Sequence, residues 1–574
     1  MKRDNLLAAF KTAALVAAVG GLCLVLLPNY WIFLVTAVFI IGMSLQSLGL
    51  VVGRSGMISL CQMSFAGVGA WTVGYLNLIG FPGGLIVWML IGGLAALPFG
   101  LIIGIPALRL RGINLAIVTL GFAVAFGVVL GTITYPGQTT FQMVQRPAGF
   151  DSDRGYFILV LIVYGISAVA LEVVSRSRLG ASWLAVSHSE RAAASLGVSV
   201  PLSKLSAFAI SSFIAGVSGG LLAGYMGTLL ADNFSMMQSL VLFAVAIMVG
   251  AQFPLGAILG GILVALFPEL LRRLNLPQDL GSVIFGLGAV QALSTGETMS
   301  ETFGRLIRKM MPKRPAAGGG DETALPAPRP DTGAPNALQA SGITVRYGNV
   351  VALNNASLSV PKGKVVGLIG PNGAGKSTFV DAMTGYLPRY EGDVLFQGDN
   401  INALGVTQRA RAGLRRTWQT TRMAPDLTVG QYVDLASGGG LTDAEIAAVL
   451  DWFDCPPAGE LIAAVDSGAR RLLDVAGVVA ARPPVILLDE PAAGQSYAEA
   501  VMLGKRIAEI PQRFGSSVLL IEHDMDLVRT ACSEVTVLDF GTVLAAGPTA
   551  EVLDMPVVKK AYMGIDFEHE EAAE

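Results

Sequence analysis

The stretch "VVGLIGPNGAGKST", residues 365–378, decides the fold of the second half of this chain of 574 residues. Its first five residues form a short β-branched run suited to a buried strand, and the following "FVDAMTGYL" has a helical pattern. Between the two, "GPNGAGKST" has the G-x-x-x-x-G-K-[ST] spacing of a phosphate-binding loop in the strand, loop and helix context that this motif requires. The spacing therefore predicts an α/β domain that holds a nucleotide.

In a loop of this kind, backbone N–H groups and the N-terminus of the helix surround the phosphates. Lys376 is expected to reach the β and γ phosphates, and Ser377 is expected to ligate Mg²⁺. The predicted nucleotide site consists of Gly370, Pro371, Asn372, Gly373, Ala374, Gly375, Lys376, Ser377 and Thr378.

Two later apolar runs end in groups suited to phosphoryl transfer. "PVILLDE" is a second strand, which ends in Asp489 and Glu490. Transfer to water requires a carboxylate in the Mg²⁺ shell and another that polarises the attacking water, and these two residues are predicted to fill the two roles. "VLLIEHDMDLV" is a third strand that ends at His523, which we predict to sense the γ phosphate.

The first half of the chain has the composition of a membrane protein. Only 14% of all residues are charged, and the mean hydropathy of +0.61 is too high for a soluble enzyme of this length. From about Leu6 to Val290, apolar runs approach the roughly 20 residues that cross a bilayer as a helix. The Pro-, Gly- and Ala-rich stretch from Met311 to Asn336 is typical of a flexible tether.

These features predict an all-α membrane domain followed by an α/β nucleotide-binding domain. The predicted boundaries are 1–310 for the membrane domain, 311–337 for the linker, 338–567 for the α/β domain and 568–574 for an acidic tail. The basic N-terminus with its apolar stretch is interpreted as a first membrane helix that is retained. The net charge of −3 does not indicate a nucleic-acid partner.

Arg and Lys clusters predict the topology of the membrane domain, because such clusters mark cytoplasmic loops. They predict an even number of crossings, about eight to ten, with both ends of this half in the cytoplasm; the pair Arg272 and Arg273 fits less well. The middles of the clearest spans lack charged residues, which argues against a proton relay or a voltage sensor. Energy for transport is therefore expected from the nucleotide.

A short helix is predicted in the longest internal cytoplasmic loop, "SHSERAAASLGVSVP". Ser187 and Glu190 have the spacing of a reciprocal capping box, Gly197 can adopt the left-handed stop, and Pro201 is expected to prevent continuation. Such a helix can receive force from a soluble partner, although a simple connector is the alternative interpretation.

Taken together, the motifs resemble an ABC-type ATPase over essentially all of Leu338 to about Phe567. The resemblance implies that Tyr347 stacks on adenine and that Gln419 contacts Mg²⁺ and links the ATPase to the membrane domain. "LLDEPAAG", "LLIEHDMDLV" and "PVVKKAYMG" further resemble the ATPases of branched-chain amino-acid importers.

The membrane half resembles the permease of the same transporters across most of Val51 to Gly250, in "SGMISLCQMSFAGVGAW", "LRLRGINLAIVTLGF" and the segment that begins "SERAAASLGVSVP". The resemblance implies a fused permease and ATPase in the bacterial inner membrane, with the ATPase in the cytoplasm and the short helix as the coupling helix. It also implies MgATP, a second permease, a second ATPase and a periplasmic or lipid-anchored binding protein. Relatives carry branched-chain or other small amino acids, amides or urea.

One motif departs from the family. The signature L-S-G-G-Q, with which one ATPase caps the ATP of its partner, falls on "VDSGA", residues 465–469, and places Asp466 at the serine position. A carboxylate about 4 Å from a phosphate charge would cost on the order of 4 kcal/mol at an effective dielectric constant near 20. If the signature is aligned one residue later, Ser467 takes the place of the signature serine and Gly468 follows it. The resemblance also implies a helical subdomain in the ATPase. The segment between Gln419 and Val465 is shorter than usual for these ATPases, so whether this subdomain forms stays open.

The departure suggests that the two ATP sites of the ATPase pair differ. A different ATPase subunit with an intact signature completes the site on this chain, while Asp466 weakens the site on that partner subunit. Two further classes remain open at this point. One is an ABC exporter, which would share the ATPase motifs. The other is a membrane-anchored regulatory ATPase that transports nothing.

Overall fold

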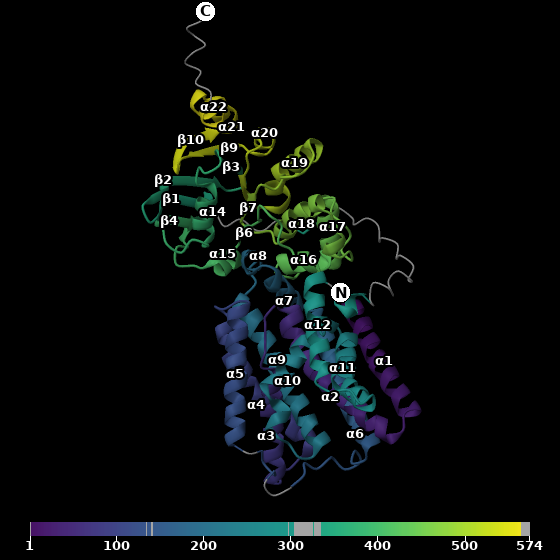
Figure 1. Cartoon of the computed structure of the whole chain (residues 1–574). Coiled ribbons are helices and arrows are strands. Elements are labelled where there is room, and N and C mark those ends of the chain that lie inside the picture. The colour runs from purple at the N-terminus through teal and green to yellow at the C-terminus, as the bar shows by residue number, and fades with distance from the viewer. Residues whose placement is uncertain are drawn as a thin grey trace, which may run out of the picture. The chain divides into compact units, whose positions relative to one another are not determined.

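The computed structural model describes residues 2–133, 135–138, 142–296, 298–302, 325–326 and 335–563 (Figure 1). These residues belong to two compact units. The helical unit comprises residues 1–187 and 200–314, and the α/β unit comprises residues 188–199 and 315–574. The predicted tail, 568–574, lies outside the described residues, as does the predicted linker apart from residues 325–326 and 335–337.

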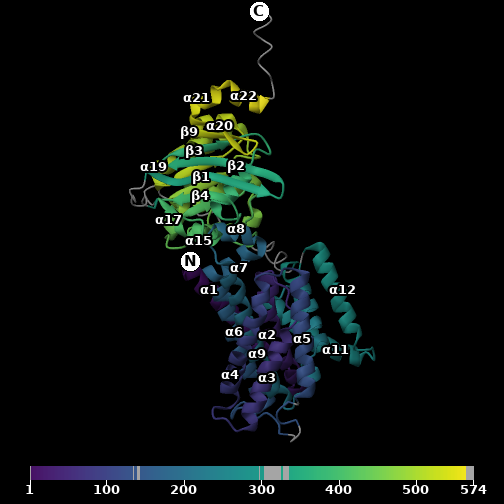
Figure 2. The ribbon, with the colours of Figure 1, turned by 90° about the vertical axis from the view of Figure 1, so that its left-hand side faces the viewer.

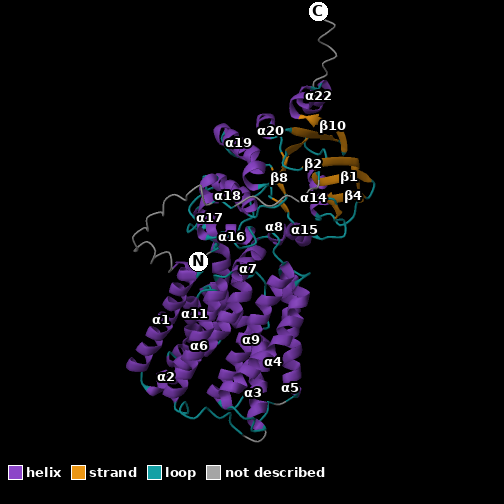
Figure 3. Ribbon diagram, turned by 180° about the vertical axis from the view of Figure 1, so that it is seen from behind, coloured by secondary structure: helices purple, strands orange, loops and turns teal. Residues whose placement is uncertain are grey.

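The helical unit is built from helices, most of which are long and apolar (Figure 3). They are α1 (Lys2–Leu26), α2 (Asn29–Gly49), α3 (Gln62–Leu78), α4 (Gly84–Ala107), α5 (Ile113–Thr132), α6 (Asp153–Ser175), α7 (Arg178–His188), α9 (Val200–Met226), α10 (Met236–Val249), α11 (Pro254–Arg273) and α12 (Leu280–Thr295). A π-helical turn, η1 (Leu50–Arg54), continues α2, and a 3-10 turn, η2 (Ala231–Phe234), precedes α10. In the described part of the chain, 8 helical segments are long and apolar enough to cross a membrane, which agrees with the lower end of the predicted range.

Glycine allows α3 and α9 to approach each other closely inside the helical unit. A Cβ atom built on Gly219 would lie 1.8 Å from the carbonyl oxygen of Ala66, and one on Gly69 would lie 2.0 Å from the carbonyl oxygen of Gly216. Any larger residue would therefore collide with the neighbouring backbone. In lipid, where the hydrophobic effect does not drive helices together, such backbone contact supplies much of the packing energy.

The α/β unit contains two sheets (Figure 2). The four-stranded antiparallel sheet has the order β2-β1-β4-β5, formed by β1 (Asn336–Tyr347), β2 (Val350–Pro361), β4 (Glu391–Phe396) and β5 (Asp399–Asn400). The six-stranded sheet has the order β10-β9-β3-β8-β7-β6, formed by β3 (Val365–Ile369), β6 (Leu414–Arg416), β7 (Val485–Asp489), β8 (Ser517–Ile521), β9 (Glu534–Asp539) and β10 (Thr542–Pro548). Its strands are parallel except β10, which is antiparallel to β9.

The parallel strands bring the predicted motifs to one edge. All residues of β3 and β8 are buried, as expected for strands covered on both faces. Helices α14 (Lys376–Thr384), α15 (Val406–Ala412), α19 (Tyr497–Phe514), α20 (Met525–Ala531), α21 (Thr549–Asp554) and α22 (Pro556–Met563) complete this part of the unit. Ligands of open α/β sheets bind beyond the carboxyl ends of the strands, where β3, β7 and β8 end here.

A helical subdomain forms although the segment between Gln419 and Val465, which contains most of it, is short. It consists of α16 (Val429–Ala436), α17 (Asp443–Trp452), the 3-10 turn η4 (Ile462–Ala464) and α18 (Ser467–Ala480). The side chains of Thr428, Thr442 and Asp466 each accept a hydrogen bond from a backbone N–H in the first turn of the helix that follows. Each of these three helices therefore begins with a side-chain cap that satisfies a backbone N–H group of its first turn.

A short helix forms at the predicted place, but Ser189 and not the predicted Ser187 caps it. Helix α8 (Glu190–Ser195) begins after Ser189, whose Oγ accepts from the N–H of Ala192 at 3.3 Å. Ser187 lies inside α7, and its Oγ donates to the carbonyl oxygen of Leu184 at 2.9 Å. The chain becomes extended only at Ser189, with φ −156° and ψ 107°, so only this serine has cap geometry. Gly197 adopts the predicted left-handed conformation, with φ +79°.

Candidate nucleotide-binding site

A cavity of about 430 Å³ lies at the carboxyl edge of the six-stranded sheet. Its lining brings together the phosphate loop, the end of β7 and the loop after β6. The lining residues are Val350, Val351, Ala352, Asn372, Gly373, Ala374, Gly375, Lys376, Ser377, Thr378, Gln419, Asp489, Glu490, Ile521, Phe540 and Gly541. Seven of the nine predicted loop residues, Asn372 to Thr378, therefore line one cavity with Gln419, Asp489 and Glu490.

The phosphate loop has the backbone conformation that its glycines permit. Gly373 and Gly375 have φ of +85° and +102°, a region that other residues rarely adopt. A Cβ atom on Gly375 would also lie only 2.8 Å from the carbonyl oxygen of Ala352. The ammonium of Lys376 donates to the carbonyl oxygens of Gly370 and Pro371, at 2.7 and 3.0 Å. These two residues thus act through their carbonyl groups and lie outside the cavity lining.

Burial lowers the pKa of Lys376, while the nearby carboxylates of Glu490 and Asp489 act in the opposite direction. The same desolvation would strengthen the attraction between its ammonium and a phosphate group placed in the cavity.

Asp489 is held by a buried arginine. The Arg416 guanidinium donates to Asp489 Oδ2 at 2.8 Å and to Asp381 Oδ1 at 2.5 Å, and only 4% of the Arg416 side chain is exposed. The backbone N–H of Asp489 donates to Thr417 Oγ1 at 3.1 Å. These bonds fix the carboxylate at the wall of the cavity.

Glu490 has an unusual backbone conformation at the point where chemistry is predicted. Its φ is +47°, which is costly for a residue with a side chain and is often found at functional sites. Two bonds hold it: its N–H donates to the carbonyl oxygen of Ile521 at 2.9 Å, and its carbonyl oxygen accepts from Arg471 at 3.0 Å. The Gln419 amide donates to Glu490 Oε2 at 2.8 Å.

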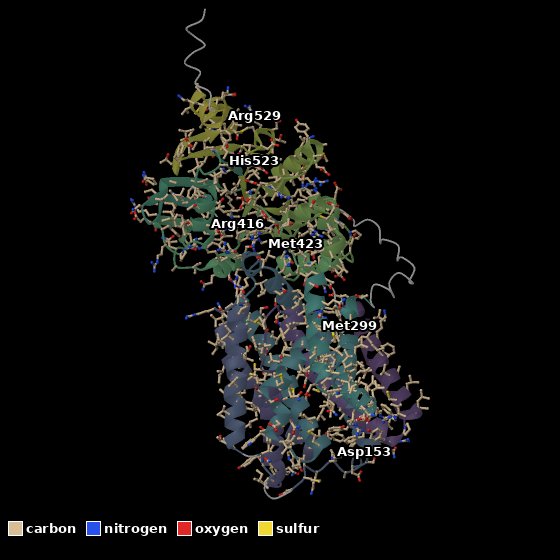
Figure 4. The ribbon with its side chains drawn as sticks, viewed as in Figure 1. Asp153, Met299, Arg416, Met423, His523 and Arg529 are labelled. Carbon is tan, nitrogen blue, oxygen red and sulfur yellow. The ribbon has the colours of Figure 1, made fainter. Side chains whose placement is uncertain are left out.

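His523 lies beside the same carboxylate. Its Nδ1 is 3.9 Å from Glu490 Oε1 and 3.6 Å from Glu522 Oε2, and 61% of its side chain is exposed. Figure 4 labels His523 and Arg416 among the side chains of the α/β unit. Burial raises the pKa of Glu522. His523 lies outside the cavity lining, so its role as a phosphate sensor stays a prediction.

The predicted adenine contact is placed beside the cavity. Tyr347 ends β1, pairs with Val350 and is 53% exposed, but it lies outside the lining. Val350, Val351 and Phe540 belong to the apolar part of the lining, together with Ala352, Ala374 and Ile521. Stacking by Tyr347 therefore stays a prediction.

Asp466 in the signature segment serves as the N-cap of α18. Its Oδ1 accepts from the N–H of Ala469 at 2.9 Å, while Ser467 is the first residue of the helix. Arg470 donates to the carbonyl oxygens of Ile462 and Ala463, and Arg471 reaches the carbonyl oxygen of Glu490. The two arginines thus tie residues 465–469 to the preceding turn and to the backbone of Glu490.

The residues present suit MgATP. Ser377, Gln419 and Asp489 supply oxygen ligands along one cavity, which is the ligand type that Mg²⁺ prefers beside substrate phosphates. The loop leaves no space for a Cβ atom at Gly375, as expected of a tight phosphate cradle.

Comparison with known proteins assigns the family. The model described as "ABC transporter" matches residues 353–493, and the model described as "Branched-chain amino acid transport system / permease component" matches residues 27–290. BraF of Pseudomonas aeruginosa, a high-affinity branched-chain amino acid transport ATP-binding protein, is 32% identical over 248 residues, which are 40% of this chain and 97% of BraF. The chain belongs to the ABC transporter family. This ABC transporter chain fuses a permease domain to its ATPase.

Other relatives match the ATPase of this ABC transporter chain. LivG of Escherichia coli, also a high-affinity branched-chain amino acid transport ATP-binding protein, is 32% identical over 40% of this chain and 97% of LivG. LptB of Escherichia coli, a lipopolysaccharide export system ATP-binding protein, is 30% identical over 40% of this chain and 98% of LptB. A crystal structure of a nucleotide-free ATP-binding cassette from an ABC transporter covers 40% of this chain and 100% of its own, with 25% identity and a TM-score of 0.36.

The family assignment confirms that this chain is a transport-coupled ATP hydrolase with a multi-pass membrane domain. Sequence reasoning missed three residues that organise its site, namely Arg416, Arg471 and Glu522. Arg416 lies three residues before Gln419 in "RRTWQ", which offered a weak signal for Arg416.

Proposed function

We propose that this chain couples ATP hydrolysis to the import of branched-chain or related small amino acids, or of amides or urea, across the bacterial inner membrane. The proposal rests mainly on one observation: a single chain carries both a match to the permease of branched-chain amino acid transport and an ATPase site in which Lys376, Asp489 and Glu490 line one cavity. Its ATPase relatives BraF and LivG serve the same kind of transport.

In the proposed reaction, bound MgATP supplies the phosphoryl group that is transferred to water. Lys376 neutralises phosphate charge, and Ser377, Gln419 and Asp489 would hold the metal. Glu490 Oε1 is available to accept a proton from water, while its Oε2 is oriented by the Gln419 amide. His523 lies on the Oε1 side of the carboxylate, where a γ-phosphate contact would report nucleotide state.

The chain is proposed to act with a second permease, a second and non-identical ATPase, and a periplasmic or lipid-anchored binding protein, surrounded by membrane lipid. The partner's signature would complete the site on this chain. Asp466 would weaken the site that this chain completes on the partner. The ATPase and both termini are placed in the cytoplasm, in accord with the basic loops of the permease domain.

Uptake by the reconstituted complex tests the proposal. We expect proteoliposomes that contain all partners to accumulate radiolabelled leucine when MgATP and the binding protein are supplied from the appropriate sides. Release that does not require a binding protein would support an exporter instead. No ATP-dependent movement of any of the named solutes would support a regulatory ATPase. No present observation favours either alternative over import; the LptB match is the weaker one.

A further inference from the structure

We propose that Trp418 and Arg416 form a positioning route through which the coupling helix α8 sets the orientation of Asp489. The inference rests on the proposed function, in which hydrolysis is coupled to transport, and it names residues that connect α8 to the nucleotide site. All members of this route belong to the α/β unit, which includes residues 188–199.

The route begins at the buried end of α8. The Trp418 indole N–H donates to Ser195 Oγ at 3.1 Å, and Ser195 is only 4% exposed. A second contact fixes the same helix: Tyr386 Oη donates to the carbonyl oxygen of Arg191 at 2.6 Å. The Tyr386 and Trp418 rings meet edge to face, with centroids 5.0 Å apart. A shift of α8 would therefore move the indole directly.

The middle of the route is a buried cation on an aromatic face. The Arg416 guanidinium carbon lies 4.5 Å from the centre of the Trp418 ring, within the range of a cation–π interaction. Because only 4% of the Arg416 side chain is exposed, this contact is little screened by water. The planar guanidinium thus takes its orientation from the ring beneath it.

At its far end, the guanidinium joins two elements of the nucleotide site. One nitrogen donates to Asp489 at the end of β7, and another donates to Asp381 on α14, the helix that starts in the phosphate loop. A rotation of the guanidinium would change both bonds together. Asp489 is the carboxylate proposed to hold Mg²⁺, so the route ends at the metal ligand.

The route is separate from the one that the family resemblance implies through Gln419. The Gln419 amide is engaged with Glu490 Oε2, and Trp418 contacts α8 with its own side chain. Neighbouring residues of one segment therefore serve different carboxylates: Gln419 orients Glu490, and Arg416 orients Asp489. Neither Arg416 nor Trp418 lines the cavity, so both are positioning residues.

Conservative substitutions separate this role from folding. Trp418→Phe keeps an aromatic face but removes the N–H donor, and Ser195→Ala removes the acceptor. Arg416→Lys keeps a positive charge but loses the planar two-pronged donor geometry. Trp452→Phe is a matched control, because Trp452 is also buried beside an arginine, Arg513, whose guanidinium carbon lies 5.8 Å from the ring centre, but it lies in the helical subdomain.

The experiment uses the complete complex in proteoliposomes. Hydrolysis is measured with and without solute-loaded binding protein. Mn²⁺ affinity is measured by paramagnetic resonance with a non-hydrolysable ATP analogue. We expect Trp418→Phe and Ser195→Ala each to reduce the stimulation by loaded binding protein several-fold, and the double variant to reduce it no further. Arg416→Lys should weaken Mn²⁺ binding several-fold, whereas Trp452→Phe should change neither quantity.

The proposal is overturned if the effects of Trp418→Phe and Ser195→Ala multiply, if stimulation is unchanged in both, or if Trp452→Phe has the same effect. If the wild-type complex shows no stimulation, the proposed function fails. The route is then judged by Mn²⁺ affinity, and an unchanged affinity in Arg416→Lys overturns it. Melting temperatures of all variants identify any that merely fail to fold.

Discussion

The Gln419 amide nitrogen lies 2.8 Å from Glu490 Oε2 and donates a hydrogen bond to it. The carboxylate therefore keeps a fixed orientation in a residue whose backbone, at φ +47°, is already constrained. General bases contribute roughly 10²–10⁴-fold to rate. We expect Glu490→Gln to lower ATP turnover of the purified complex at least 100-fold, with ATP affinity retained. Turnover at the parent level would show that the site on this chain is not the hydrolytic one.

The charge on Asp466 can be separated from its capping role. Asn caps helices about as well as Asp, so Asp466→Asn should preserve α18 while removing a repulsion on the order of 4 kcal/mol. We expect at least a roughly tenfold rise in turnover at the site that this segment completes, measured with the other site silenced by Glu490→Gln. Asp466→Ala is the control, because it removes the charge together with the cap, at a cost of about 1 kcal/mol. Unchanged turnover in Asp466→Asn would argue against the asymmetry.

Asp474 makes the stability of the ATPase depend on pH. Burial raises the pKa of its carboxyl to about 6, opposed by the hydrogen bond that Tyr432 Oη donates to it. The pKa of an aspartate carboxyl in the unfolded state is about 3.9. Because the pKa of Asp474 is higher in the folded state, the carboxyl stabilises the folded state fully at pH values below about 3.9, and this contribution is lost as pH rises through about 6. From pH 5 to 7.5 the loss is about 1 kcal/mol.

We therefore expect the melting transition of the α/β unit to fall by roughly 2–4 °C over this pH range through Asp474 alone. In Asp474→Asn, which can still accept from Tyr432, this part of the fall should disappear. Differential scanning fluorimetry at both pH values measures the difference. Equal slopes for the parent and Asp474→Asn would contradict the assignment.

The contact between α3 and α9 is predicted to tolerate no side chain. In Gly219→Ala, the new Cβ atom would lie 1.8 Å from the carbonyl oxygen of Ala66, so the helices must separate. We expect a loss of about 1–3 kcal/mol, the usual cost of overpacking, seen as a lower melting temperature in detergent. Gly121→Ala on α5 is the matched control, since nothing lies within 4 Å of its Cβ position. Similar losses in both variants would mean that helix propensity and not the contact is being measured.

The sequence predicted the local features of the site well. The phosphate loop and the acids at the end of β7 depend on short-range spacing, and the structure places Lys376, Asp489 and Glu490 around one cavity. The role of Arg416 could not be predicted, because its partners Asp381 and Asp489 lie 35 and 73 residues away in the chain. The register of β6 beside β7 brings Arg416 close to Asp489, and Asp381 comes from α14.

Helix α8 shows how a local motif can mislead. Ser187 and Glu190 have the spacing of a capping box, but α7 continues through Ser187 to His188. The backbone leaves the helical region only at Ser189, so this residue and not Ser187 caps α8. Asp466 shows the opposite case: it departs from the family signature, yet a standard N-cap explains why an aspartate is accommodated at that position.

Nucleotide binding by the full-length chain tests the central claim most directly. Titration with a fluorescent ATP analogue in the presence of Mg²⁺ should show saturable binding by the parent and by Glu490→Gln. Lys376→Ala should abolish it, because the ammonium that reaches the phosphates is removed. Two results would contradict the claim: no binding of adenine nucleotide by the folded parent, or binding by Lys376→Ala that is as tight as that of the parent. In either case the loop at 370–378 would not hold the ATP that drives the membrane helices.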